Sequence, residues 1–336
     1  MAGVSQSHND GLIGGGLIGG GLIADQPAPP HAAAKARRLR RDPGFHAGWL
    51  VTPAALWLLV FLIVPLVSII TFSFWKSTGH GMEVDFTFTH YAEYFINKGF
   101  FDPDSRNFLT PSVFIRNLGS TLRFTLEVMF FCLLLAYPIA YFLAMQVGSF
   151  QWQMALFLLA MVPFWTSYLI RAVAWLPMLG RRGLLNSLLI SLGIIDKPTS
   201  VLLYSEFGYT VALVQLYVVL CVGPIFFSLA KIDKAIIEAA RDMGASAFQI
   251  FREIIVPLSL PGVAIGMIFI FIVIMGEFAT AVVVYGGKTS TVGTVILNYY
   301  AIANYPFAAV NALMLMLAMM IGVVIILRLV NIRKEL

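Results

Sequence analysis

Long apolar runs separated by short polar segments dominate this chain. Six of the runs reach the roughly 20 residues that an α-helix needs to cross the hydrocarbon core of a bilayer. They lie at residues 49–70, 121–143, 154–175, 208–229, 262–285 and 307–330. The pattern predicts an all-α, polytopic transmembrane bundle with six spans. Gly262 and Gly266 form a GxxxG step in the fifth run, which favours close packing against a neighbouring helix.

Composition supports the same class of protein. Apolar residues make up 59% of the 336 residues and the mean hydropathy is +0.86, whereas a soluble domain is typically about 45–50% apolar. The net charge is +5, but the basic residues flank the spans, where membrane topology accounts for them. We therefore expect membrane lipid, and not nucleic acid, around this chain.

The first 34 residues repeat Gly-Leu-Ile-Gly-Gly and end in a proline-rich stretch, a composition that holds no stable helix. Five cations follow between Lys35 and Arg41, directly before the first span. The positive-inside rule places this end in the cytoplasm, and an even number of spans returns the C-terminus to the same side. We expect a disordered, basic cytoplasmic tail over residues 1–45 and a transmembrane domain over 46–336.

A charged segment at residues 231–261 separates the fourth and fifth runs and carries eight charged side chains. Apolar residues recur at three- and four-residue steps on both sides of Gly244, which predicts two short amphipathic helices. Ser246 suits the N-cap of the second helix, and we expect Pro257 and Pro261 to end it. The segment is either a cytoplasmic helix–turn–helix or an amphipathic helix lying on the bilayer.

The spacing in this segment is Glu-Ala-Ala, three residues, Gly, nine residues and Ile-Ile-Val-Pro. It resembles the EAA loop of ABC-importer permeases, with Val256 where that family usually has Leu. A fixed spacing over about twenty residues disfavours the surface-helix alternative. The resemblance implies a loop that seats in a groove of an ATPase subunit. The coupling residues it implies are Glu238, Ala239, Ala240, Arg241, Asp242, Gly244 and Pro257.

The resemblance extends from about residue 49 to the C-terminus. The stretches VPFWTSYLIR, IEAARDMGAS and YPFAA are similar to the spermidine/putrescine permease branch of these importers. This likeness implies a type I (MetI-like) fold in a bacterial inner membrane. It also implies three partners: a homologous second permease, a dimer of ATP-binding subunits and an extracytoplasmic solute-binding protein. The expected cargo is a small organic cation, first of all a polyamine; the alternative is another small organic solute.

The chain itself offers no nucleotide site. Gly287-Lys288-Thr289 resembles the end of a phosphate-binding P-loop, but Val282 stands where that motif requires glycine. We therefore expect no cofactor in this chain, a transport subunit and not an enzyme, and ATP hydrolysis in a separate partner. Two rival classes are weaker. A secondary transporter would more often show internal duplication, and an intramembrane enzyme would need a histidine cluster, metal-ligand set or nucleophile–base pair.

Three ionisable residues fall within or near the spans: Glu127, Arg171 and Glu277. Charges at this depth are costly and usually face a bundle interior or a water-filled path. Glu277 is the deepest acidic candidate, and a glutamate lining a path would attract a cationic solute. The alternative is a structural ion pair between Glu277 and Arg171.

Aromatic residues follow Pro163, at which we expect a kink. Trp165, Tyr168 and Trp175 recur at three- and seven-residue offsets, so we expect them to share roughly one helix face. Because aromatic faces attract ammonium groups, these residues are substrate-path candidates together with the ionisable ones. The alternative is packing against helices or lipid in an interfacial aromatic belt.

Overall fold

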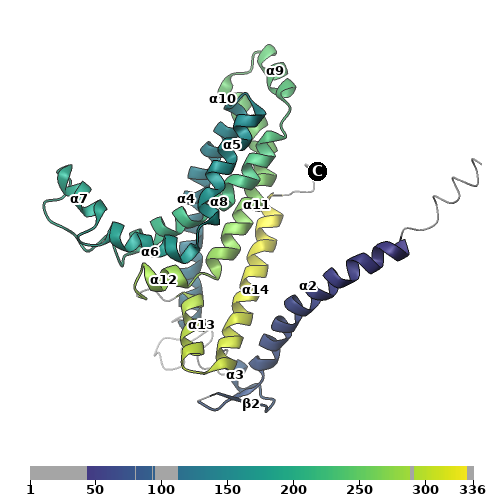
Figure 1. Cartoon of the computed structure of the whole chain (residues 1–336), viewed down its shortest axis with the longest axis vertical. Helices are drawn as coiled ribbons and strands as arrows, with labels where there is room; N and C mark the ends of the chain where they lie inside the picture. The colour runs from purple at the N-terminus through teal and green to yellow at the C-terminus, as the bar shows by residue number, and fades with distance from the viewer. Residues whose placement is uncertain (1–43, 80, 93, 95–112, 288–290, 331–336) are drawn as a thin grey trace, which may run out of the picture. The chain divides into compact units, whose positions relative to one another are not determined.

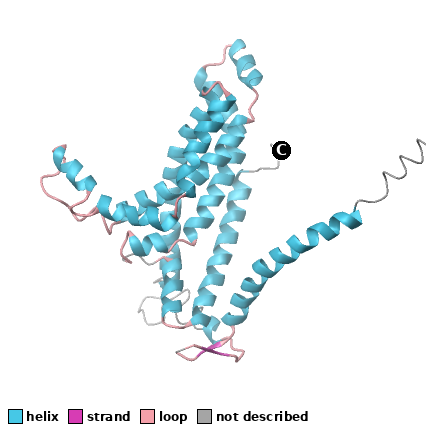
Figure 2. Cartoon of the chain, in the orientation of Figure 1, coloured by secondary structure: helices cyan, strands magenta, loops and turns pink. Residues whose placement is uncertain are grey.

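The computed structural model describes residues 44–79, 81–92, 94, 113–287 and 291–330. Nearly all of the predicted tail, residues 1–45, lies outside this part, as do Lys288 and Thr289. The chain divides into two units, residues 1–62 and 63–336. Helix dominates the described part, as Figure 2 shows. Within it, strands occur only in the hairpin of β1 (Lys76–Ser77) and β2 (Met82–Glu83), paired antiparallel with Lys76 opposite Glu83. The all-α expectation is confirmed.

Figure 1 labels most of the helices. Their bounds are α2 (Gly44–Ser73), α3 (Thr89–Ala92), α4 (Val113–Tyr141), α5 (Phe150–Met161), α6 (Tyr168–Leu179), α7 (Leu184–Ser191), α8 (Glu206–Ala230), α9 (Lys234–Asp242), α10 (Ala247–Ile250), α11 (Val256–Met275), α12 (Ala279–Val283), α13 (Val292–Ala301) and α14 (Tyr305–Val330). Turns of other pitch join some of them: π-helical at Phe142–Gln146 and Phe251–Ile255, and 3-10 at Val162–Trp165.

Five continuous helical stretches in the described residues are long and apolar enough to cross a membrane. They are Val51–Ser73, Ile115–Gln146, Glu206–Ala230, Ala247–Met275 and Tyr305–Leu329. They correspond to five of the six predicted spans.

The predicted third span is not one helix. Phe150–Trp165 and Tyr168–Ser191 meet at an angle of 83°, and the second part runs sideways from the long helices (Figure 1). Pro163 opens a 3-10 turn, and Thr166 and Ser167 have extended ψ angles of 149° and 129°. The kink expected at Pro163 is confirmed, but it separates two helices, so the predicted span over 154–175 exists only if this bent pair counts as one.

The fifth span also differs from the prediction at both ends. Pro257 and Pro261 do not end a helix, because a continuous stretch runs from Ala247 to Met275 through the π-helical turn Phe251–Ile255. Pro257 lies in the first turn of α11, directly after the π-helical turn, where the altered pitch accommodates a residue without an N–H. At the other end the helix stops at Gly276, well before residue 285, and the short α12 follows.

Helix α8 lies at the centre of the bundle and packs against α4 and α11. The contact with α11 depends on small residues. A Cβ atom added to Gly262 would lie 2.5 Å from both the Pro224 carbonyl oxygen and the Ser228 Cβ, and one added to Gly266 would lie 3.0 Å from the Cys221 Sγ. The packing role predicted for the GxxxG step is confirmed.

Substituting Gly262 by alanine tests this packing. We expect Gly262→Ala to lower the free energy of unfolding by about 1–3 kcal/mol, because the new methyl group collides with backbone and α8 must move away. The measurement is the thermal unfolding midpoint of the detergent-solubilised protein. Gly223→Ala is the matched control, since its Cβ would be 4.0 Å from the nearest atom, the Phe157 Cζ. Equal midpoints for both variants would contradict the close-packing account.

Candidate functional site

The charged segment forms the predicted helix–turn–helix. Asp233 caps α9 by accepting a hydrogen bond from the Ala235 N–H at 2.9 Å. Gly244 then turns the chain with φ +87°, the left-handed conformation that favours glycine after a helix end. Ser246 and Gln249 form a reciprocal capping box at α10, with bonds of 3.3 and 2.8 Å. The break at Gly244 and the cap at Ser246 are both confirmed.

This segment carries three large apolar side chains that are uncovered in the isolated chain. Ile236, Met243 and Phe248 are exposed to 48, 82 and 67%. Figure 1 shows α9 and α10 at the end of the long helices opposite α13. A cluster of large exposed apolar side chains among charges is typical of a surface that binds another protein.

The residues expected to couple to an ATPase divide by position. Ala240 is buried against the bundle, and Pro257 lies in the first turn of α11. Glu238 is exposed, and within the described ranges it forms no hydrogen bond or ion pair. The others are also exposed: Ala239, Arg241, Asp242 and Gly244.

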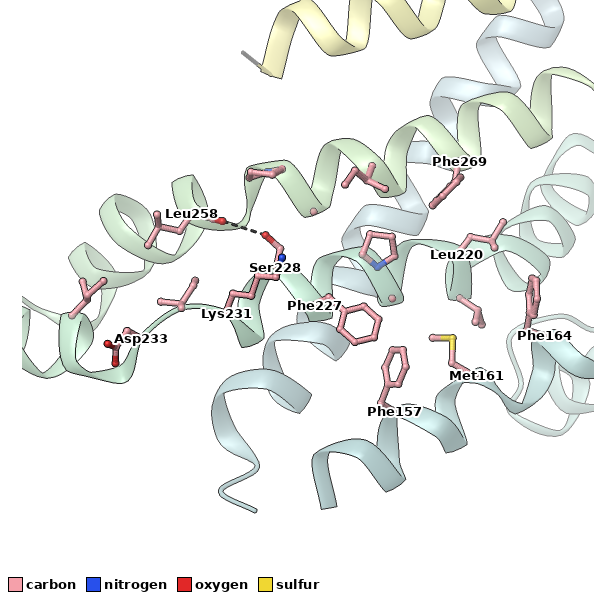
Figure 3. Close-up of a pocket in the computed structure, with 18 residues that line it drawn as sticks. Phe157, Met161, Phe164, Leu220, Phe227, Ser228, Lys231, Asp233, Leu258 and Phe269 are labelled. Carbon is pink, nitrogen blue, oxygen red and sulfur yellow. Dashed lines mark hydrogen bonds between the residues drawn. The ribbon is translucent and has the colours of Figure 1, made fainter. Parts of the chain in front are cut away.

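An open, mostly apolar groove of about 900 Å³ lies beside the start of α9. Figure 3 shows the rings of Phe157 and Phe227 turned toward each other in it, and the hydrogen bond that the Ser228 hydroxyl donates to the Leu258 carbonyl at 3.2 Å. Residues of α5, α8, α9 and α11 share its lining, including Ile236 of the amphipathic segment. The segment and three membrane helices therefore border one continuous surface.

Glu277 is the centre of a second candidate site, in the break between α11 and α12. It is only 6% exposed. Its Oε1 accepts hydrogen bonds from the Tyr168 hydroxyl at 2.6 Å and the Thr280 N–H at 2.7 Å, and its Oε2 accepts one from the Tyr217 hydroxyl at 2.6 Å. Tyr168 is the first residue of α6, directly after the break in the third span. The two helix breaks therefore meet at one carboxylate, which we call the carboxylate junction (Glu277, Tyr168, Tyr217 and Thr280).

Arg171 does not pair with Glu277. Its Nη1 donates to the Leu216 carbonyl at 3.2 Å, and its buried Nε has no hydrogen-bond partner within the described residues. Among the described residues, the ion pair is between Arg123 and Glu206, at 2.7 Å, and both of its side chains are largely exposed. The predicted alternative, a strut between Arg171 and Glu277, is therefore wrong for this structure.

The three aromatic candidates do not share a face. Trp165 lies in the 3-10 turn and is 75% exposed, Tyr168 points to the carboxylate junction, and Trp175 donates from Nε1 to the Gln215 side chain at 3.3 Å. We expected the helix after the kink at Pro163 to contain all three, but α6 begins only at Tyr168, so the break at Thr166 and Ser167 separates Trp165 from the other two.

Three further tyrosines stack in this region, and the sequence pattern did not indicate them: Tyr209, Tyr217 and Tyr285. Tyr209 stacks on Tyr285 with ring centroids 5.6 Å apart, and Tyr217 stacks on Tyr168 at 6.3 Å. Tyr209 and Tyr217 are eight residues apart, about two helical turns, so their spacing could have placed them on one face of α8. Nothing in the spacing indicated that this face meets Glu277.

Glu127, the remaining candidate, lies on α4 near the same region. It is half-buried and accepts a hydrogen bond from the Thr210 hydroxyl at 3.3 Å. The carboxylates of Glu127, on α4, and of Glu277, in the break between α11 and α12, thus both bind hydroxyls of α8, and tyrosine rings lie beside Glu277. Carboxylates among aromatic rings are suited to hold an organic cation.

Comparisons with known proteins agree with this architecture. The chain is 34% identical over 265 residues to the spermidine/putrescine transport system permease protein PotB of Salmonella typhimurium (strain SL1344), which covers 78% of this chain and 86% of the relative. It is equally similar to PotB of Escherichia coli (strain K12), with 78% and 90% covered. A crystal structure of a bacterial alginate ABC transporter in complex with its alginate-bound periplasmic protein shares the fold, with a TM-score of 0.64 at 18% identity over 86% of this chain and 96% of the other.

The family described as "Binding-protein-dependent transport system inner membrane component" matches residues 112–333. This range contains the helix–turn–helix, the groove and the carboxylate junction. The chain belongs to this family, the membrane permeases of ABC importers.

Proposed function

We propose that this chain is one permease subunit of an importer that moves a polyamine, such as spermidine or putrescine, into the cell. The observation that carries the proposal is the 34% identity to the spermidine/putrescine permeases over 78% of the chain. Members of this family are membrane components of transport systems and not enzymes. ATP hydrolysis therefore belongs to a partner.

The chemistry of the bundle supports a cationic cargo. A polyamine carries two or more ammonium groups joined by methylene chains, so it needs carboxylates for the charges and apolar or aromatic surface between them. Glu277 is buried beside two tyrosine rings and forms no salt bridge with an arginine or lysine of the described chain. An anionic cargo would meet a carboxylate without a paired cation at this place.

The helix–turn–helix of α9 and α10 is proposed as the surface that binds the ATP-binding subunit. Its exposed Ile236, Met243 and Phe248 supply the apolar area, and the charges around them orient the partner. The remaining proposed partners are a second, homologous permease, the other ATP-binding subunit and an extracytoplasmic solute-binding protein. With the bent third span counted as one, six spans leave both termini in the cytoplasm of a bacterial cell.

Coupling in this proposal is mechanical. The helix that begins at Ala247, in the docking surface, continues to Met275, one residue before the break that holds Glu277. Its 29 residues correspond to a length of about 43 Å at 1.5 Å per residue. When ATP closes the partner ATPases, the docking surface moves with them, and this helix transmits the displacement to the carboxylate junction.

ATP-dependent uptake in reconstituted vesicles tests the function. The chain is co-expressed with its neighbouring permease, ATPase and binding protein, and uptake of radiolabelled spermidine is measured with and without ATP. We expect ATP-dependent accumulation and co-purification of the ATPase. Uptake that needs no ATPase would point to a secondary transporter, and uptake of an uncharged or anionic solute in place of spermidine would refute the polyamine assignment.

Gly244→Val should uncouple ATP hydrolysis from transport. A β-branched residue at φ +87° costs roughly 1–3 kcal/mol, and the turn between α9 and α10 would change shape, although a Cβ there meets no atom within 4 Å. Gly244→Asn is the matched control, because asparagine adopts this conformation readily. Uptake and ATPase co-purification are measured for both. Normal values in Gly244→Val would remove the docking role of the turn.

Glu238→Ala should weaken assembly with the ATPase without changing which solute is carried. Glu238 is exposed and has no partner in the described chain, so we assign its hydrogen bond to the interface. A hydrogen bond to a charged group contributes about 1.5–3 kcal/mol, which predicts at least about a tenfold loss of affinity. The control is Glu83→Ala, an exposed glutamate of β2. Equal ATP-dependent uptake and ATPase affinity in the two variants would refute the role.

A further inference from the structure

We propose that the carboxylate junction is a binding site for one ammonium group of the solute, with Glu277 as its counter-ion and the hydroxyls of Tyr168 and Tyr217 as additional ligands. The inference rests on the proposed function, because it names the place where a polyamine is held within this permease. It assigns to Glu277 a role in binding and to the two tyrosines a role in recognition.

The carboxylate of Glu277 forms hydrogen bonds but no salt bridge with the described residues. The three groups that donate to the carboxylate are all neutral: two phenols and one backbone N–H. The guanidinium of Arg171 is directed to the Leu216 carbonyl, and the ion pair of the described chain lies elsewhere, between Arg123 and Glu206. Hydrogen bonds lower the cost of burying an anion, but an opposite charge lowers it further. The site is therefore suited to a cation that comes and goes.

The hydroxyl oxygens of Tyr168 and Tyr217 can accept hydrogen bonds while they donate to Glu277. A phenol oxygen that donates its proton to a carboxylate keeps lone pairs that accept a hydrogen bond. The Tyr168 oxygen also lies 2.7 Å from the Thr280 hydroxyl, so an ammonium group at this place can donate to the carboxylate, to the Tyr217 oxygen and to the remaining lone pair of Tyr168. The rings of the two tyrosines stack at 6.3 Å, which holds both hydroxyls on the same carboxylate. A neutral or anionic group would gain none of these contacts.

The junction lies where two spans are interrupted. In secondary transporters, solute sites are typically built from discontinuous helices, and here too the breaks of two spans meet at one carboxylate. Tyr168 opens α6 after the break in the third span, and Glu277 lies between α11 and α12. Glu277 also binds the Thr280 N–H in the first turn of α12. One side chain thus joins α6, α8 and α12 to the end of α11.

Binding at this site would alter these connections. An arriving ammonium donates to carboxylate oxygens that the phenols already use, so the links from Glu277 to α6 and α8 lengthen as the solute binds. A ligand shifts a conformational equilibrium only through its different affinity for the two states. The junction supplies such a difference, because the carboxylate binds only protein groups when the site is empty and shares its oxygens with the solute when it is filled.

Aromatic rings also lie beside the exposed ion pair of Arg123 and Glu206. The Arg123 guanidinium lies 5.6 Å from the centroid of the Phe124 ring, which contacts Tyr209 at 5.1 Å and Tyr285 at 6.4 Å. These rings, together with the Glu206 carboxylate, offer a polyamine further attractive groups in the same chain.

The test uses the full complex with its ATPase and binding protein, reconstituted in vesicles. Glu277→Gln keeps the size of the side chain and removes its charge. We expect the maximal rate of spermidine uptake to fall at least tenfold, while the yield of assembled complex and its unfolding midpoint stay near wild type. Glu83→Gln is the matched control, an equivalent change on an exposed hairpin, and should transport normally. Unchanged uptake by Glu277→Gln would overturn the proposal.

Two further variants separate binding from a purely structural role. Glu277→Asp keeps the charge on a shorter side chain, and we expect it to transport at least threefold faster than Glu277→Gln. Tyr217→Phe removes one hydrogen bond to Glu277 without changing the charge, and we expect a smaller loss of uptake than in Glu277→Gln. If uptake in all three variants simply follows the amount of assembled complex, or if neither Glu277 variant assembles, Glu277 only holds the helices together and the proposal fails. If wild type itself takes up no polyamine, the proposed function fails first.

Discussion

Backbone hydrogen bonding is the constraint on which the rest of this structure depends. Within a bilayer no water is available, so each N–H and C=O at a helix break needs a partner from the protein. At the first break the Thr166 N–H donates to the Pro163 carbonyl at 3.3 Å. At the second, Glu277 accepts from the Thr280 N–H, and the Thr291 hydroxyl donates to the Glu277 carbonyl at 3.4 Å. The protein can interrupt two spans only because these local partners exist.

The same constraint explains why a carboxylate is kept in the bundle. Glu277 supplies an acceptor for the first turn of α12 and, with its remaining capacity, binds the phenols of two other helices. Close packing elsewhere supports this arrangement: Gly262 and Gly266 bring α11 against α8, the helix that carries Tyr217. The position of the carboxylate therefore depends on the glycine contacts as well as on its own hydrogen bonds.

Sequence patterns predicted the turn and the cap of the charged segment correctly. They indicated the break in the third span only as a kink at Pro163, and they did not indicate the break at Glu277. The turn at Gly244 and the cap at Ser246 follow from residue chemistry within a few positions, and both are present. The runs of apolar residues located five spans, but hydrophobicity does not distinguish a straight helix from the 83° bend after Trp165. Pro257 was expected to end a helix, but the helix continues through it because the preceding π-helical turn accommodates a residue without an N–H. The carboxylate junction joins residues 60 and 109 positions apart in the chain, a distance beyond any local pattern.

The central claim is that the docking surface and the carboxylate junction move together as the two ends of one rigid helix. Pulsed electron resonance on spin-labelled, assembled complexes measures this directly. One pair of labels replaces Ala247 and Ile272, both exposed on the helix from Ala247 to Met275; a second pair replaces Ile272 and Leu122 of α4, also exposed. The account predicts that ATP binding leaves the first distance unchanged and shifts the second by several ångströms. A change in the first distance with a constant second distance would mean that the helix bends before the junction, which contradicts the account.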